Sequence, residues 1–343
     1  MVNTTMPHDV FIGCDWGSTS FRLRVVERGT RRILAGQSSA NGVKAFTSVP
    51  PAGRAASMSR FFAEQLAACP EVGQTAPIII TGMASSNVGW RELPYASAPF
   101  PLDGSQAKWE RLEFSDLNGR PREALLVSGV RTADDVMRGE ECALIGAPAL
   151  CPIAAAPLVL CLLAGTHPKH ALLRERTLVS FRTHLTGELF DLLSRESLLA
   201  GSVGRAALDA PPDLGEVSAG VACFRERGVS GALFQVRSRH LSRNTSRAAN
   251  AWFLSGILMG GELERIPLLC QGAALLLIGD PLRVTLYRTA LRELGAVTAA
   301  ESAVALPLTE AIVAGQESLL DRFASSARPA NQPEPEPGHA NQR

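Results

Sequence analysis

The sequence carries almost no net charge. Its 34 Lys and Arg side chains balance 33 Asp and Glu side chains, which gives a formal charge of +1. It also has no run of basic residues interleaved with aromatic ones, a pattern typical of nucleic-acid-binding surfaces. We therefore expect no nucleic-acid partner.

Long apolar runs are also missing. The most apolar segments, 152–164 and 273–279, are shorter than the roughly 20 residues that a membrane-spanning helix needs. Residues 1–10 are polar and carry His8 and Asp9 where a signal peptide has a continuous apolar stretch. We expect no membrane contact, no export signal and a cytoplasmic location.

Several motifs are absent as well. The seven cysteines are an odd number without a C-x-x-C pair, which favours reduced, buried thiols over a disulfide framework. No G-x-x-x-x-G-K-[ST] occurs, and no G-x-G-x-x-G follows a strand, which excludes a Walker phosphate loop and argues against a Rossmann site. His167 and His170 lack a third ligand at a suitable spacing, so we expect no zinc.

The chain is long enough to form two cores, and its predicted elements follow one order twice. A length of 343 residues with 46% hydrophobic side chains exceeds what one core usually holds, so we expect two domains. Each half begins with a strand that runs into a turn containing Gly and Ser or Thr, followed by further strands and a helix. The first half has predicted strands at 10–14, 20–26, 31–35 and 77–80 and a helix at 52–68. The second half has predicted strands at 158–163, 169–174, 177–182 and 274–278 and helices at 186–193, 249–263, 282–294 and 308–323.

The two Gly-containing turns are candidate phosphate sites. Gly17 allows close backbone approach, and Ser18 and Thr19 offer hydroxyl and amide donors to phosphate oxygens. The segment 165–167, Gly-Thr-His, stands at the equivalent place in the second half. A nucleotide bound between two lobes needs such a turn from each, although a plain hairpin turn favours the same residues.

Acidic residues gather between the turns, at 134–141. Transfer of a phosphoryl group to an alcohol commonly uses a carboxylate to orient and deprotonate the hydroxyl, and Glu140 or Glu141 supplies one. The alternative is that both residues favour the first turn of the helix that follows. Gly279 and Asp280 join a predicted strand to a helix, where they either face adenosine or form a structural turn.

Five segments together resemble the 2-dehydro-3-deoxygalactonokinase family and occur in that family's order. They are 15–19 (DWGST), 82–83 with 86–90 (GM, SNVGW), 137–141 (MRGEE), 165–167 with Lys169 (GTH, K), and 182–183 with 186–189 (RT, TGEL). The resemblance implies an α/β, two-lobed, actin-like ATPase of the ribonuclease H-like type, each lobe a mixed sheet with flanking helices. It also implies ATP, Mg²⁺ and phosphorylation of the C6 hydroxyl of 2-dehydro-3-deoxy-D-galactonate.

The same resemblance implies domain limits and residue roles. We expect an N-terminal lobe at 8–135, a C-terminal lobe at 136–323, and a disordered tail at 324–343, where Pro, Asn, Gln and Glu prevail. Glu140 takes the position of the catalytic base with Glu141 beside it, and Asp15 binds Mg²⁺. The other implied site residues are Gly17, Ser18, Thr19, Gly165, Thr166 and His167 for the ATP phosphates, Gly279 and Asp280 on the adenosine side, and Ser86, Asn87, Trp90, Arg138 and Arg182 for the sugar acid, with Arg22 as a further cation for its carboxylate.

Other functions stay open at this point. A kinase of the same fold acting on 2-dehydro-3-deoxygluconate or an ordinary aldose is one alternative, because one fold serves many acceptors. A non-catalytic sugar-acid sensor is another, although such regulators usually carry a DNA-binding domain, for which the residues before Phe11 leave no room. The expected partners are the sugar acid and ATP, and a homodimer stays open.

Overall fold

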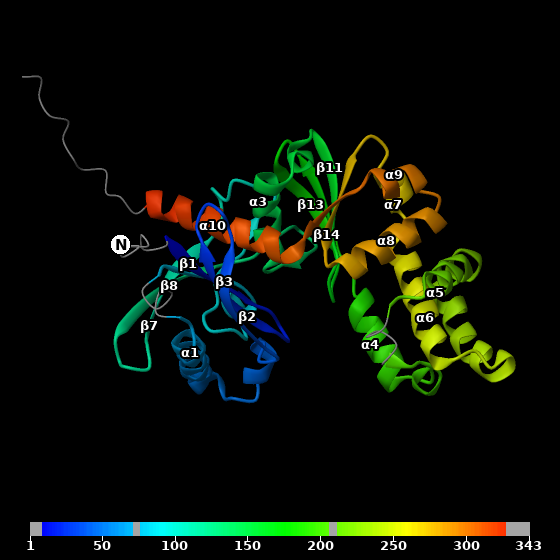
Figure 1. Ribbon diagram of the computed structural model, residues 1–343, viewed down its shortest axis with the longest axis horizontal. Coiled ribbons are helices and arrows are strands. Elements are labelled where there is room, and N and C mark those ends of the chain that lie inside the picture. The colour runs from blue at the N-terminus through cyan, green and yellow to red at the C-terminus, as the bar shows by residue number, and fades with distance from the viewer. Residues whose placement is uncertain (1–8, 71–75, 206–210, 327–343) are drawn as a thin grey trace, which may run out of the picture.

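The computed structural model describes residues 9–70, 76–205 and 211–326, which form two lobes side by side (Figure 1). Each lobe is built on a six-stranded sheet. The N-terminal sheet has the order β3 (Ile33–Ser39), β2 (Phe21–Glu27), β1 (Val10–Trp16), β4 (Ile78–Gly82), β8 (Pro121–Val127), β7 (Trp109–Ser115). The C-terminal sheet has the order β15 (Val304–Pro307), β14 (Ala274–Gly279), β11 (Leu158–Leu163), β12 (Lys169–Arg174), β13 (Thr177–Thr183), β6 (Phe100–Pro101).

The two sheets share one topology. In the first, β1, β2 and β3 are antiparallel, and β4 and then β8 continue in parallel from β1. In the second, β11, β12 and β13 are antiparallel, and β14 and then β15 continue in parallel from β11. This repeated mixed sheet confirms the predicted α/β, two-lobed, ribonuclease H-like architecture.

The helices cover both sheets. The described residues also contain three short strands and four short 3₁₀ helices. The helices are α1 (Pro51–Ala67), α3 (Glu140–Leu150), α4 (Thr186–Glu196), α5 (Leu214–Arg243), α6 (Arg247–Leu263), α7 (Ile266–Leu269), α8 (Pro281–Glu293), α9 (Val297–Ser302) and α10 (Leu308–Ser326). A small sheet contains β10 (Val136–Met137), β9 (Val130–Arg131) and β5 (Ala96–Ser97). The 3₁₀ helices are η1 (Val43–Phe46), η2 (Met83–Ser85), η3 (Pro152–Ala155) and η4 (Ala200–Ser202).

Strand β1 is buried on both faces. Ile12 and Trp16 point to one side, into a core that includes Met58 and Phe62 of α1. Phe11 belongs to the core on the other side, which holds residues of both lobes. A strand buried on both faces reads as an apolar run, which explains why this strand was predictable from the sequence.

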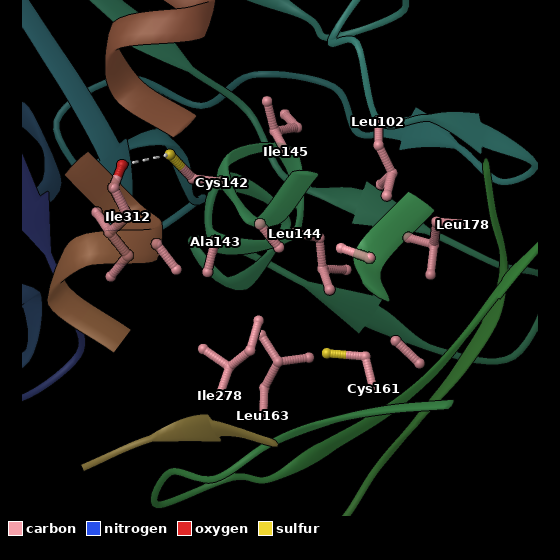
Figure 2. Packing of buried hydrophobic residues seen from close by; sticks show 14 of the residues in the cluster. Leu102, Cys142, Ala143, Leu144, Ile145, Cys161, Leu163, Leu178, Ile278 and Ile312 are labelled. Carbon is pink, nitrogen blue, oxygen red and sulfur yellow. Dashed lines mark hydrogen bonds between the residues drawn. The ribbon is translucent and has the colours of Figure 1, made fainter. Parts of the chain in front are cut away.

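The second core lies between the lobes, where α3 and α10 cross (Figure 2). Leu163 and Ile278 of the C-terminal sheet pack beneath Ala143 of α3. The two helix backbones approach so closely that a Cβ on Gly315 of α10 would lie 1.9 Å from the carbonyl oxygen of Cys142. Only glycine permits this contact, which places the start of α3 deep between the lobes.

The lobes also exchange elements. β6 precedes the β7–β8 hairpin of the N-terminal sheet in the chain, but it pairs with β13 of the C-terminal sheet. In the other direction, α10 lies across the N-terminal sheet near β1 and β4 (Figure 1). It ends at Ser326 rather than at the predicted Phe323, and the rest of the predicted tail, 327–343, lies outside the described residues.

Helix α5 had no counterpart in the sequence analysis. It packs along α6, and the two helices project from the C-terminal sheet (Figure 1). Its backbone departs from helical geometry at Gly228, with φ of +66°, so its apolar positions do not follow one continuous period. None of the helices in the described part of the chain is long and apolar enough to span a bilayer.

Candidate active site

The first phosphate turn joins β1 to β2 and is held from beneath by η1. Within the turn, the Gly17 N–H donates to the Ser20 carbonyl at 2.8 Å. From η1, the Val43 N–H donates to the Gly17 carbonyl at 3.0 Å and the Lys44 N–H to the Ser18 carbonyl at 2.9 Å. The carbonyls are therefore engaged, while Ser18 is half-buried and Thr19 is exposed. The Ser18 and Thr19 side chains therefore remain accessible to an anion.

The second turn joins β11 to β12 and is held by the start of α4. The Gly187 N–H donates to the Thr166 carbonyl at 3.1 Å, and His167 Nε2 lies 2.6 Å from Glu188 Oε2. This hydrogen bond and the charge of His167 lower the pKa of the Glu188 carboxyl, and the charge of Lys44 adds to the effect. Because Lys44 belongs to η1, the supports of the two turns lie close enough to interact.

Asp15 stands at the end of β1, next to the first turn. Its Oδ2 accepts a hydrogen bond from Arg22 Nη1 at 3.2 Å, and its side chain is 14% exposed. Burial raises the pKa of the Asp15 carboxyl, and the nearby charge of Glu140 adds to this, although Arg22 and Arg24 oppose it. Arg22 therefore does not fully compensate the buried carboxylate, which suits an additional cation.

A magnesium ion fits this position. Mg²⁺ is usually bound by one or two carboxylates together with substrate phosphates and water, rather than by a full cage of protein ligands. Asp15 offers such a carboxylate beside the phosphate turn. Across residues 9–70, 76–205 and 211–326, no three His, Cys, Asp or Glu side chains converge into a metal-binding group.

Glu140 is the first residue of α3 and lies between the turns. Its Oε1 pairs with Lys169 Nζ at 2.9 Å, and its Oε2 accepts the Arg138 N–H at 3.1 Å. The Glu140 side chain is 30% exposed, whereas Lys169 is 5% exposed. Glu140 is thus fixed at both oxygens and still reachable from solvent, as a general base must be.

Glu141 has a different environment. It is buried, and both of its oxygens accept the Gly139 N–H, at 2.9 and 2.8 Å. Burial and then the charge of Glu140 raise the pKa of Glu141 to about 8. Glu141 therefore stabilises the turn before α3, and of the two predicted carboxylates Glu140 is the one that a substrate can reach.

The predicted sugar-acid residues at 86–90 follow β4 and differ in exposure. Asn87 is exposed, whereas Ser86 is buried and its hydroxyl donates to the Met83 carbonyl at 2.7 Å. Trp90 is 7% exposed and packs edge-on against Trp16 with ring centroids 6.1 Å apart. In this arrangement Trp90 anchors the loop to the core, and Asn87 is the accessible member.

The predicted arginines are also placed differently. The Arg138 guanidinium donates to the Ser85 carbonyl at 2.5 Å and to the Ser128 hydroxyl at 3.2 Å, and it lies over the Tyr95 ring. It therefore stabilises the loop after β4. Arg182 is exposed and lies beside His170 in the β12–β13 register, on the sheet face opposite Lys169.

The turn predicted to face adenosine, Gly279 and Asp280, lies next to the second predicted phosphate turn. A Cβ on Gly279 would lie 3.0 Å from the Cβ of Ala164, which directly precedes Gly165. Asp280 caps α8, since its Oδ1 accepts the Arg283 N–H at 2.9 Å. Asp280 therefore has the structural role that the sequence left open. The turn that carries it adjoins the second phosphate turn.

A family model described as 2-keto-3-deoxy-galactonokinase matches residues 15–315. The chain belongs to this family. The match begins at Asp15 and includes both phosphate turns, Glu140 and the first part of α10, up to residue 315.

Individual relatives of this galactonokinase-family chain include two curated proteins. It is 32% identical over 264 residues to an Escherichia coli 2-dehydro-3-deoxygalactonokinase, covering 74% of this chain and 79% of the relative. It is 33% identical over 294 residues to a Rhizobium meliloti protein named as a probable 2-dehydro-3-deoxygalactonokinase, covering 83% of this chain and 90% of the relative. A crystal structure of a Sinorhizobium meliloti protein assigned to the same enzyme superimposes with a TM-score of 0.71 at 29% identity, covering 91% of this chain and 99% of that chain.

Two cations in this galactonokinase-family chain, Lys169 near Glu140 and Arg24 near Asp15, had no role predicted from the sequence. Lys169 stands in one of the resembling segments, but its contact with Glu140 depends on tertiary structure. Arg24 is buried beside Asp15, and its Nη1 has no hydrogen-bond partner in the described residues. A charged residue inside the largely apolar strand 20–26 was a usable signal for Arg24, since buried arginine is rare unless paired.

Proposed function

We propose that this chain is an ATP-dependent kinase that phosphorylates the C6 hydroxyl of 2-dehydro-3-deoxy-D-galactonate. The product is 2-dehydro-3-deoxy-6-phospho-D-galactonate, an intermediate of D-galactonate catabolism. One observation carries the proposal: in a chain of this family, Glu140 is fixed at both oxygens yet accessible, close to Asp15 and between two anion-accepting turns.

In this proposal the two turns bind the ATP phosphates. Ser18 and Thr19 donate from the N-terminal lobe, and Gly165 and Thr166 donate from the C-terminal lobe. Asp15 would hold Mg²⁺, which when bound supplies positive charge to the phosphate oxygens. Gly279 and Asp280, next to the second turn, would adjoin the adenosine. His167 supports the second turn through Glu188.

Glu140 would orient the C6 hydroxyl and accept its proton as the hydroxyl attacks the terminal phosphorus. Such a base contributes about 10²–10⁴-fold to the rate when it is within hydrogen-bond reach. Glu141 would stay protonated at neutral pH, since its pKa is raised to about 8, and would hold the Gly139 turn. Contact between the closed lobes would exclude water, which otherwise competes as acceptor.

Recognition of the sugar acid needs a cation for its carboxylate. The Arg138 guanidinium already bonds to Ser85 and Ser128, so it would act through the loop that carries Asn87. Arg22 and Arg182 have exposed side chains and remain the direct candidates. Alanine variants at these two positions distinguish them: the one that binds the carboxylate should raise KM for the acid without changing KM for ATP.

The substrate is tested by ADP release from purified protein with MgATP and a panel of acceptors. The panel holds 2-dehydro-3-deoxy-D-galactonate, its gluconate-derived epimer, D-galactose and a no-acceptor control. Turnover confined to the galactonate-derived acid supports the proposal. Preference for the epimer or for galactose would establish a kinase with another acceptor, and binding without turnover would favour a sensor.

Static light scattering on the same preparation measures whether the chain forms the homodimer that the sequence left open.

A further inference from the structure

Lysine is rare in this chain. Of its 34 basic residues only three are lysines, Lys44, Lys108 and Lys169, and the rest are arginines. Lys44 and Lys108 are exposed, whereas Lys169 is buried and stands two residues after the second phosphate turn, as the first residue of β12. The one buried lysine thus stands beside the proposed catalytic base.

The bonds of Lys169 leave one donor unused. Nζ donates to the His167 carbonyl at 2.9 Å and forms an ion pair with Glu140 Oε1 at 2.9 Å. An ammonium group has three N–H donors, and among the described residues only these two acceptors contact it. Because Glu140 is 30% exposed, the ammonium bound to it lies next to space that a ligand can enter.

A second contact holds the same elements together. Lys169 pairs with Thr183 in the β12–β13 register. The Thr183 N–H and hydroxyl both donate to the carboxylate of Asp135, at 2.5 and 2.8 Å. Asp135 directly precedes β10, which leads into α3 and Glu140. Two contacts, Lys169 with Glu140 and Thr183 with Asp135, therefore join the ends of β12 and β13 to the segment that carries the base. These contacts fix the position of the ammonium.

On the basis of the proposed function, we infer that Lys169 is a catalytic residue: its ammonium holds Glu140 through Oε1 and donates its third N–H to an oxygen of the phosphoryl group in transfer. Charge spreads over the equatorial oxygens of that group, and a fixed cation stabilises it. Arg22 already pairs with Asp15, and the Arg138 guanidinium already bonds to the loop after β4, whereas Lys169 is the cation held against Glu140.

The step balances without a further reactant. The C6 oxygen forms a bond to the terminal phosphorus as the bond between that phosphorus and its bridging oxygen breaks, and ADP leaves. The hydroxyl proton moves to Glu140, whose Oε1 is held by Lys169, and passes to solvent when the product departs. Lys169 donates hydrogen bonds throughout and transfers no proton. A compact ammonium suits this place better than the planar fork of arginine.

The test uses MgADP with aluminium fluoride, a mimic of the phosphoryl group in transfer that requires neither a base nor a known acceptor. Calorimetry measures the ADP affinity with and without fluoride in the full-length wild type and in Lys169→Met. We expect the fluoride-dependent gain in affinity to fall at least tenfold in the variant, with affinity for MgADP alone changed less than about threefold. Lys108→Met, at an exposed position, is the matched control and should behave as wild type.

Removing Lys169 leaves Glu140 without its partner, so the measurement is repeated in the double variant Lys169→Met/Glu140→Gln, in which neither charge of the pair remains. Retention of the fluoride-dependent gain in Lys169→Met/Glu140→Gln would overturn the inference and leave Lys169 a structural role. With the acceptor, Lys169→Met should lower kcat at least 100-fold with KM changed little, and Lys169→Arg should recover part of it. A wild-type chain that binds the fluoride complex but phosphorylates no acceptor would count against the proposed function alone.

Discussion

The backbone of Gly139 lies directly against that of Gly82. A Cβ on Gly139 would come 3.2 Å from the Gly82 Cα, and a Cβ on Gly82 would come 2.7 Å from the carbonyl oxygen of Trp16. Trp16 precedes the first phosphate turn, Gly82 precedes the loop with Asn87, and Gly139 precedes Glu140. The three segments proposed to bind ATP, bind the sugar acid and deprotonate it therefore meet through these two backbone contacts.

Gly139→Ala should damage both folding and turnover. Gly139 has φ of +111°, which L side chains rarely adopt, and its Cβ would also press on Gly82. We expect a loss of about 2–4 kcal/mol in the free energy of unfolding, measured by urea titration, and a fall in kcat. Gly119→Ala is the control: its φ is +76°, but no atom lies within 4 Å of its Cβ, so it should cost only about 1–2 kcal/mol. Equal losses in the two variants would argue against the contact with Gly82.

Glu140→Gln should abolish most of the catalysis while keeping the fold. An amide keeps the size of the side chain but does not accept the hydroxyl proton, so kcat should fall by about 10²–10⁴. Coupled ADP release with the acceptor measures this, and Glu310→Gln, at an exposed position on α10, is the control that should retain full activity. Wild-type kcat in Glu140→Gln would remove Glu140 from the role of base.

Glu141 should make stability depend on pH. Its pKa is about 8 in the folded chain against an ordinary 4.5, so its contribution is fully present below about pH 4.5 and is lost as pH rises through 8. The reason is that the unfolded chain releases this proton at lower pH than the folded chain does. Glu141→Gln has no such proton, so the stability of wild type relative to the variant should fall by a few kcal/mol between pH 5 and pH 8.5, as measured by urea titration at both pH values. A constant difference would show that Glu141 is already ionised in the folded chain.

Arg138→Ala should act on stability first. Removing the guanidinium leaves the Ser85 carbonyl and the Ser128 hydroxyl without this donor and uncovers the Tyr95 ring. We expect a loss of about 2–4 kcal/mol in the free energy of unfolding, and a rise in KM for the acid because the loop with Asn87 loses its support. The control is Arg182→Ala, an exposed position where stability should change by less than about 0.5 kcal/mol. The assigned role would be refuted by an Arg138→Ala variant with wild-type stability and a raised KM, since that pattern indicates direct contact with the substrate.

The central strands were the most predictable part of the fold. The predicted strand limits 158–163 and 169–174 coincide with β11 and β12, because an apolar run bounded by Gly-containing turns leaves few alternatives. Helix α5 was not predicted, since Gly228 interrupts its period. The β7–β8 hairpin was missed too, because its exposed, charged positions mask the alternation of Leu112 and Phe114.

The sequence by itself determined the repeated order of strands and turns, the segments that carry chemistry and, through their combination, the family. These properties depend on local backbone preference and on the spacing of apolar residues, which neighbouring positions encode. Tertiary structure decided which of two adjacent carboxylates is accessible, that Arg138 supports a loop, and that Lys169 reaches Glu140. Burial and ion pairing between residues far apart in the chain arise only when β12, α3 and the loop after β4 pack together, and no local pattern records that packing.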